Sequence, residues 1–151
     1  MTSERAIIRI LKEQINTYKM LHDLLKKERL CLVDINAEKI AEISKEKDTV
    51  IMRLRLLEEE RIRLITKFGG DNEINGEINL NDLEKFTGNN MFKVLRSQLL
   101  SLLQNIEEMN KFNSILIDRS INYLRTTSGF INTLTDGNIS QTTGVLLSKE
   151  T

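Results

Sequence analysis

No proline occurs anywhere in the 151 residues of the chain. Because a proline inside a helix costs about 3 kcal/mol, its absence allows long helices without interruption. Apolar residues recur at alternating intervals of three and four along most of the chain, which is the spacing of one helix face. The two-residue alternation that marks a half-buried strand is not found in the sequence. The pattern therefore predicts an all-α fold.

Three long helices are predicted, at residues 4–33, 36–68 and 90–127. Asp34 and Asn36 are good N-cap residues and mark the break before the second helix. So short a link forces the first two helices into an antiparallel hairpin. Since no such helix is stable alone, each must bury its apolar stripe, and we expect an elongated antiparallel three-helix bundle. The stripe of the first helix is expected to run through Ile8, Leu11, Ile15, Tyr18, His22, Leu25, Arg29 and Leu32.

The second connection is rich in glycine and asparagine. Gly69-Gly70 is expected to end the second helix, because glycine accepts the left-handed conformation of a helix C-cap. Asn81 and Glu84 have the spacing of a capping box, in which two residues satisfy each other's free N–H groups at a helix start. We therefore expect a short extra helix over residues 82–86 in this connection.

The loop from Asp71 to Asp82 partly matches the calcium-binding loop of an EF-hand. Its oxygen-bearing residues and Gly76 fall at ligand and turn positions of that pattern. Glu73 is oversized for the third position, however, and an aspartate at the twelfth is poorly suited to bidentate closure. An ordinary acidic turn is the preferred interpretation, and cation binding stays open as the alternative.

The C-terminal segment differs in composition from the helices. Between Thr126 and Ser148 the one charged residue is Asp136, and polar residues are mixed with apolar ones. Such a segment is too polar to pack alone and too apolar for a plain spacer. We therefore divide the chain into a helical bundle domain, residues 1–127, and a mobile amphipathic tail, residues 128–151. A frayed end without a role is the alternative, and the single glycine at this junction costs too little to decide where the last helix ends.

Charge and composition exclude several classes of function. The 22 basic and 22 acidic side chains balance, whereas a general binder of nucleic acid or anionic membrane should be basic. With Cys31 and His22 as the sole cysteine and histidine, an internal disulfide and the common metal sites are nearly excluded. Residues 1–30 show no signal peptide, and no apolar run is long enough to span a membrane. We expect a cytoplasmic protein with no catalytic, metal-binding or cofactor-binding residues, and therefore not an enzyme.

Two basic residues interrupt the apolar stripe of the second helix. Lys47 and Arg61 occupy positions where leucine would stabilise more, and burial without a partner would be costly. Glu107 or Glu108 on the last helix is a candidate partner. Polar stripe residues can fix helix register, and in that case Lys47→Leu should stabilise the bundle. The alternative is that these residues mark a surface that contacts another protein.

The second half of the last helix is apolar on more than one side. It carries more apolar surface than a third helix needs to cover its two partners, and such a strip suits an incoming amphipathic helix. A homodimer would use the same surface equally well. The residues predicted to bind a partner are Asn113, Leu116, Ile117, Ile121, Leu124, Phe130, Ile131 and Leu134.

Several short patterns, spread over roughly residues 20–125, occur together in a characteristic order. They are Leu24-Leu25-Lys26-Lys27-Glu28, Asp34, Glu46-Lys47, Val50-Ile51, Leu54, Leu57-Glu58, Arg61, Asn110, Asn113 and Ile115-Leu116-Ile117. In these patterns and in its helical layout, the chain resembles the FlgN family of flagellar type III export chaperones.

The resemblance implies a cytoplasmic, non-enzymatic chaperone. Such a protein would bind the C-terminal helical region of hook–filament junction proteins, block their premature assembly and deliver them to the export apparatus. Family chaperones bind cargo with their C-terminal region, which here corresponds to the apolar half of the last helix and the tail. The competing interpretation is a non-enzymatic coiled-coil adapter or structural protein, whose apolar stripe would be fully used within the bundle or a dimer.

Overall fold

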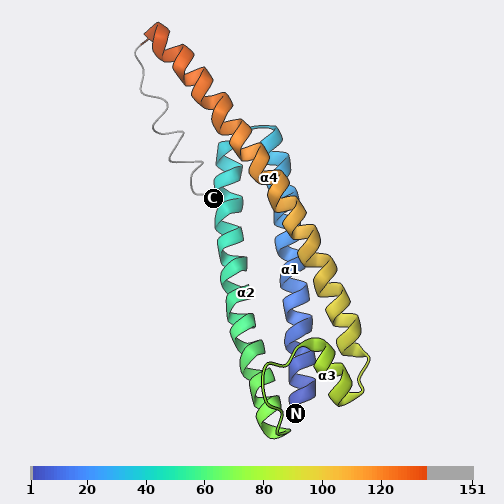
Figure 1. Cartoon of the computed structure of the whole chain (residues 1–151). Helices are drawn as coiled ribbons and strands as arrows, with labels where there is room; N and C mark the ends of the chain where they lie inside the picture. The colour runs from blue at the N-terminus through green and yellow to red at the C-terminus, as the bar shows by residue number, and fades with distance from the viewer. Residues whose placement is uncertain (1, 136–151) are drawn as a thin grey trace. The chain divides into compact units, whose positions relative to one another are not determined.

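The computed structural model describes residues 2–135, and this part of the chain contains four helices and no strand. The helices are α1 (Ser3–Val33), α2 (Ala37–Asp71), α3 (Leu80–Thr87) and α4 (Met91–Thr135), and consecutive long helices run antiparallel (Figure 1). The predicted all-α fold, with three long helices and a short one in the second connection, is confirmed. Within the described residues, no helix is long and apolar enough to cross a membrane.

Contacts divide the chain into two compact units that cut across the long helices. Unit 1 contains Met1–His22 and Thr49–Asn105, which includes α3, and unit 2 contains Asp23–Asp48 and the chain from Ile106 onward. Each unit therefore holds one portion of α1, α2 and α4. The division into a bundle of residues 1–127 and a tail of residues 128–151 stays a prediction. The last helix does continue past the predicted end at residue 127 and through Gly129.

The end of α2 differs from the prediction. The helix continues through Gly69 to Asp71, and Glu73 (φ 55°) adopts the left-handed conformation expected of a glycine. Gly69 instead allows a close approach, because a Cβ there would lie 2.9 Å from Cδ1 of Ile78. The predicted cap at Gly69-Gly70 is therefore wrong, since the first of these glycines makes room for the following loop. The predicted N-cap of α2 is confirmed, because Asn36 Oδ1 accepts a hydrogen bond from the Lys39 N–H at 3.2 Å.

The capping box of α3 lies two residues earlier than predicted. The Asn79 side chain accepts from the Asp82 N–H at 2.9 Å, and the Asp82 carboxylate accepts from the Asn79 N–H at 3.0 Å. Because α3 begins at this capping box, Leu83 lies on the buried face of the helix. Gly88, in the left-handed conformation (φ 68°), then ends α3 by donating its N–H to Glu84 O.

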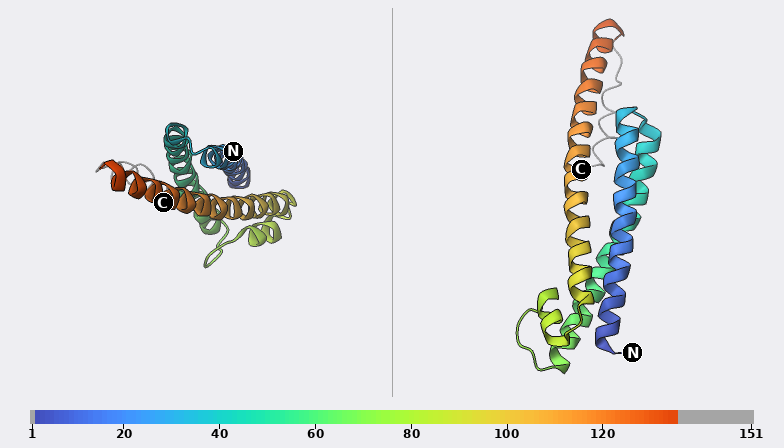
Figure 2. Two further views of the ribbon diagram at one scale, coloured as in Figure 1. Left: turned by 90° about the horizontal axis from the view of Figure 1, so that it is seen from above. Right: turned by 90° about the vertical axis from the view of Figure 1, so that its right-hand side faces the viewer.

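Buried apolar clusters lie in both units. In unit 1, the start of α4 lies beside the N-terminal part of α1 (Figure 2). Asn89, just before α4, donates from Nδ2 to Glu4 Oε1 at 2.8 Å. The buried cluster of unit 2 consists of Leu32, Ile40 and Ile117. The buried cluster of unit 1 consists of Ile7, Ile10, Leu11, Ile15, Leu57, Ile65, Phe68, Leu83, Phe92 and Leu95.

Candidate functional site

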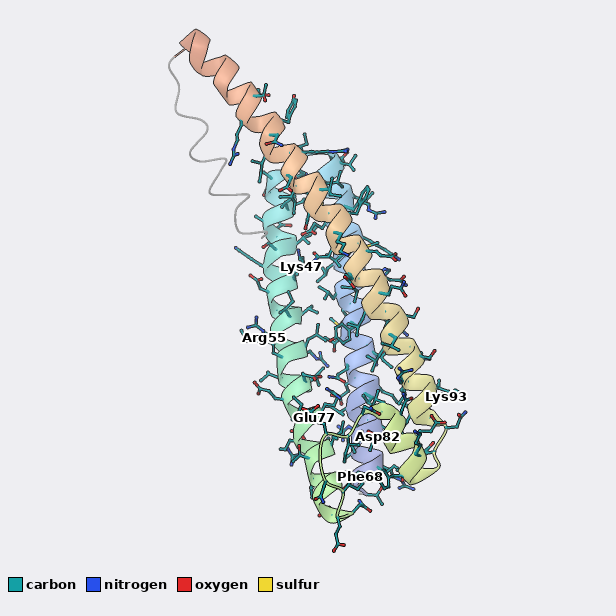
Figure 3. All side chains as sticks on the ribbon, in the orientation of Figure 1. Lys47, Arg55, Phe68, Glu77, Asp82 and Lys93 are labelled. Carbon is teal, nitrogen blue, oxygen red and sulfur yellow. The ribbon has the colours of Figure 1, made fainter. Side chains whose placement is uncertain are left out.

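A polar core, formed by Glu28, Lys47 and Asn113, joins the three long helices within unit 2. Glu28 on α1 is completely buried, and its Oε2 accepts from Lys47 Nζ of α2 at 2.6 Å. Asn113 of α4 is also completely buried, and its Nδ2 donates to Glu28 Oε1 and to the Leu25 carbonyl oxygen, both at 2.9 Å. Lys47 is labelled on α2 in Figure 3. One buried carboxylate thus receives hydrogen bonds from both of the other long helices.

The partner of Lys47 differs from the one predicted. Glu107, one of the two predicted candidates, instead pairs with Lys111 at 3.3 Å on the surface of α4. The side chains of that surface pair are 68% and 75% exposed, whereas those of Glu28 and Lys47 are 1% and 13% exposed. The sequence carried a signal for Glu28, because the buried Leu25 and Leu32 flank it at intervals of three and four residues. The predicted stripe used Arg29 at that point, which the structure leaves only half-buried.

Burial changes the expected role of Lys47. If one partner of a buried ion pair is removed, the other charge is left uncompensated, at a cost of about 3–5 kcal/mol. Lys47→Leu was expected to stabilise the bundle if the lysine only fixes helix register. That condition does not hold, because the lysine neutralises a buried carboxylate. The polar core can still fix register, since Asn113 and Glu28 meet in only one alignment of α4 with α1.

Two polar atoms beside this core have no hydrogen-bond partner in the part of the chain that the structure describes. They are Asn113 Oδ1 and Arg29 Nε, and both are buried. The Arg29 guanidinium lies over the Phe112 ring, with its central carbon 4.4 Å from the ring centre, which is the geometry of a cation–π contact. A buried acceptor without a donor costs about 1–3 kcal/mol. The Nδ2 group of Asn113 attaches α4 to α1, and its Oδ1 atom offsets part of the stability gained.

The residues predicted to bind a partner are divided by the structure into three groups. Asn113 and Ile117 are buried, and Leu116 and Ile121 are half-buried against the apolar cluster of unit 2. None of these four side chains forms a freely exposed surface. The remaining four, Leu124, Phe130, Ile131 and Leu134, have side chains outside those described. Partner binding by the eight residues stays a prediction.

A different set of apolar side chains is exposed along the same part of α4. Phe112, Ile115 and Tyr123 are 45%, 50% and 60% exposed, and we call them the α4 outer face. Their spacing of three and eight residues places them on one side of the helix. The sequence prediction missed them because it assigned the face that continues the stripe, although it did indicate that this half is apolar on more than one side.

A second polar cluster lies within unit 1 and accounts for Arg61. Its Nε donates to Glu58 Oε2 at 2.8 Å, and Gln14 Nε2 donates to the same oxygen at 2.8 Å. The hydrogen bond from Arg61 is the main cause that lowers the pKa of Glu58, against the opposing effect of burial. Burial and the nearby Glu58 charge raise the pKa of Tyr18. Arg61 is therefore paired within its own helix, and this observation does not test the predicted role in partner contact.

Glu58→Gln is expected to lower the free energy of unfolding at pH 7 by about 1 kcal/mol or less, because the pair is partly exposed. A lowered folded-state pKa contributes stability above the ordinary carboxyl pKa, and this contribution is lost as the pH falls through the folded-state pKa. In urea unfolding, the difference from the parent chain should therefore shrink as the pH falls below the ordinary carboxyl pKa of about 4.3. Glu59→Gln makes the same charge change at an exposed neighbour, and an equal loss at all pH values in both variants would contradict the prediction.

The acidic loop gives no support to cation binding. Asp82 lies in the first turn of α3, where its carboxylate caps the helix through Asn79. Among residues 2–135, no three histidine, cysteine, aspartate or glutamate side chains are grouped so that they could hold a metal ion.

Comparison with known proteins identifies a family whose model matches most of the chain. The chain matches the model of the family described as FlgN protein over residues 1–143. No curated protein and no solved structure gives a match. Because the family match covers far more than half of the chain, the protein belongs to the FlgN family, the non-enzymatic flagellar export chaperones for hook-associated proteins.

Proposed function

We propose that this chain binds the C-terminal helical region of flagellar hook–filament junction proteins in the cytoplasm. It thereby blocks their premature assembly and delivers them to the type III export apparatus. Family membership supports the general role, and the surface of α4 in unit 2 supports the mode of binding. A junction protein helix that is unpaired before assembly exposes an apolar stripe, which an apolar helix surface can cover.

The observation that carries this proposal is the α4 outer face. Single exposed apolar residues are common, but Phe112, Ile115 and Tyr123 share one side of one helix in the described chain. An amphipathic helix needs such a strip, because its anchors recur at three, four and seven residues. The predicted residue Leu116 borders the strip, and Leu124, Phe130, Ile131 and Leu134 are proposed to extend the binding surface.

Calorimetric titration with the C-terminal segment of a hook-associated protein tests the proposal. We expect saturable one-to-one binding, weakened at least tenfold by Ile115→Asp. Leu56→Asp is the matched control, because Leu56 is similarly exposed but lies on α2 in unit 1. A chain that ends at Thr126 should bind more weakly if the later residues contribute.

Absence of binding to the C-terminal segment of every hook-associated protein of the same organism would overturn the proposal. If the chain instead forms a dimer that Ile115→Asp dissociates, the coiled-coil adapter would be the better account. Equal binding by Ile115→Asp and Leu56→Asp would preserve the function but move its site away from the α4 outer face.

A further inference from the structure

A groove lies between α1 and α2 of unit 2, close to the turn that joins them. Its volume is about 470 Å³, and all the described residues that line it belong to these two helices or their turn. Its apolar lining is Leu30, Cys31 and Ile43, and Leu30 is 67% exposed. α4 packs on another side of α1, where Ile117 joins a buried cluster with Leu32. The helix packing therefore leaves apolar surface open in this groove, which we call the hairpin groove.

Charged side chains complete the lining of the hairpin groove. The acidic ones are Asp34, Glu42 and Glu46, and the basic ones are Lys27 and Lys39, so acidic side chains are in excess. Opposite charges across a contact favour the right partner and fix its register. The occupant that suits this lining therefore combines a short apolar run with a nearby cation.

One segment of the chain outside the described structure has this composition. Within residues 136–151, residues 145–147 are valine, leucine and leucine, and we call them the Val-Leu-Leu run. Lys149 is the only cation of the segment, and Glu150 follows it. The apolar, acidic and basic parts of the groove lining therefore each have a counterpart in or directly after the run.

The chain between α4 and the Val-Leu-Leu run is long enough to reach the hairpin groove. The contact of Ile117 with Leu32 shows where α4 passes the end of the hairpin. From Ile117 to Thr135, where the helix ends, α4 extends for eighteen residues, or about 27 Å. The ten residues from Thr135 to Val145 can span up to about 33–36 Å. The run can therefore return to the groove while α4 stays in place.

We propose that the Val-Leu-Leu run docks in the hairpin groove of its own chain and covers Leu30 and Cys31, with Lys149 beside the acidic lining side chains. Because the run is tethered to α4, its effective concentration at the groove is on the order of millimolar, so a small contact is sufficient. A second copy or a separate protein that uses the groove must first displace the run. The contact is therefore autoinhibitory, and it does not rest on the function proposed above.

A disulfide between the tail and the hairpin groove tests the proposal in the full chain. Cys31 lines the groove and is the single cysteine of the sequence, so Ser148→Cys, next to the run, creates one new pairing. A disulfide requires that the two Cα atoms approach within about 7 Å. With oxidised glutathione as the oxidant, we expect an intramolecular disulfide with Cys31, formed at a rate that does not depend on protein concentration.

The role of the run is tested by removal of its side chains from the Ser148→Cys chain. Leu146→Ser together with Leu147→Ser should slow disulfide formation roughly tenfold, because the tail is then no longer held at the groove. Ile139→Ser is the matched control, since it removes an apolar side chain of the same segment outside the run and should leave the rate unchanged. Equal rates with and without the run would overturn the proposal.

Alkylation of Cys31 by iodoacetamide is an independent readout that needs no second cysteine. With Leu146→Ser and Leu147→Ser, we expect Cys31 to react roughly threefold faster, because the run no longer covers its thiol. Leu30→Ser should have the same effect from the side of the groove, and its circular dichroism should stay that of the parent chain because Leu30 is exposed. Unchanged reactivity of Cys31 in both variants would contradict docking.

The same measurements distinguish the occupant of the groove. A disulfide that joins two chains, at a rate that rises with protein concentration, would overturn the intramolecular contact and assign the groove to a second copy. No hook-associated segment enters these tests. A chain that binds no such segment therefore loses the proposed function and keeps the docked tail, whereas a chain without docking keeps the proposed function and loses this inference.

Discussion

Lys47→Leu is expected to lower the free energy of unfolding by about 3–5 kcal/mol, because it leaves the completely buried Glu28 carboxylate without its cation. For a chain of this size, that loss corresponds to a decrease of roughly 6–20 °C in Tm. Thermal and urea unfolding, followed by circular dichroism, measure the change. The effect is large because folding of a domain yields only about 5–15 kcal/mol in total.

Lys111→Leu is the matched control, since it breaks the exposed pair with Glu107 on the surface of α4. An exposed pair four residues apart contributes only about 0.3–0.5 kcal/mol, so this variant should unfold almost like the parent chain. The double variant Glu28→Leu and Lys47→Leu should recover much of the lost stability, because it removes both charges. A Lys47→Leu chain as stable as the parent would show that the carboxylate is not buried in solution.

The helices could be predicted from the sequence because their signal is periodic and repeated many times. The three-four spacing extends over many turns in each long helix, so single polar residues such as Lys47 do not obscure it. Helix ends depend on one or two residues, and there the prediction was confirmed at Asn36 but failed at Gly69. Gly69 was expected to end α2, but its missing side chain makes room for Ile78, a contact that depends on how the loop folds back.

The candidate site was harder to predict, because burial of a polar residue depends on its partners. Glu28 lies in a charged run that is typical of an exposed face, although its spacing from Leu25 and Leu32 is that of the stripe. The hydrogen bonds that it accepts from Lys47 and Asn113 account for the burial of its charge. Asn113 is among the residues predicted to bind a partner. The sequence contains no measure that distinguishes an asparagine on a binding surface from one that donates to a buried carboxylate. The exposed Phe112 and Tyr123 were missed because the prediction placed partner binding on the face that continues the stripe.

Phe92→Ala is the second substitution with a large expected effect. Phe92 is completely buried near the start of α4, and it packs in the apolar cluster of unit 1. Truncation of a buried phenylalanine removes its transfer free energy and leaves a cavity, at a cost of about 3–5 kcal/mol. The urea midpoint should fall accordingly with little change in the slope of the transition, because the surface exposed on unfolding stays similar.

Phe86→Ala provides the comparison, because it removes the same atoms from α3 in the same unit, at a side chain that is 59% exposed. We expect its stability to change by about 0.5 kcal/mol or less. A similar loss in both variants would mean that Phe86 is buried in solution and that the apolar cluster of unit 1 is larger than described. At a temperature where Phe92→Ala is still folded, it should bind a hook-associated segment as the parent chain does, since the proposed binding surface lies in unit 2. Loss of binding by this folded variant would place part of the site in unit 1.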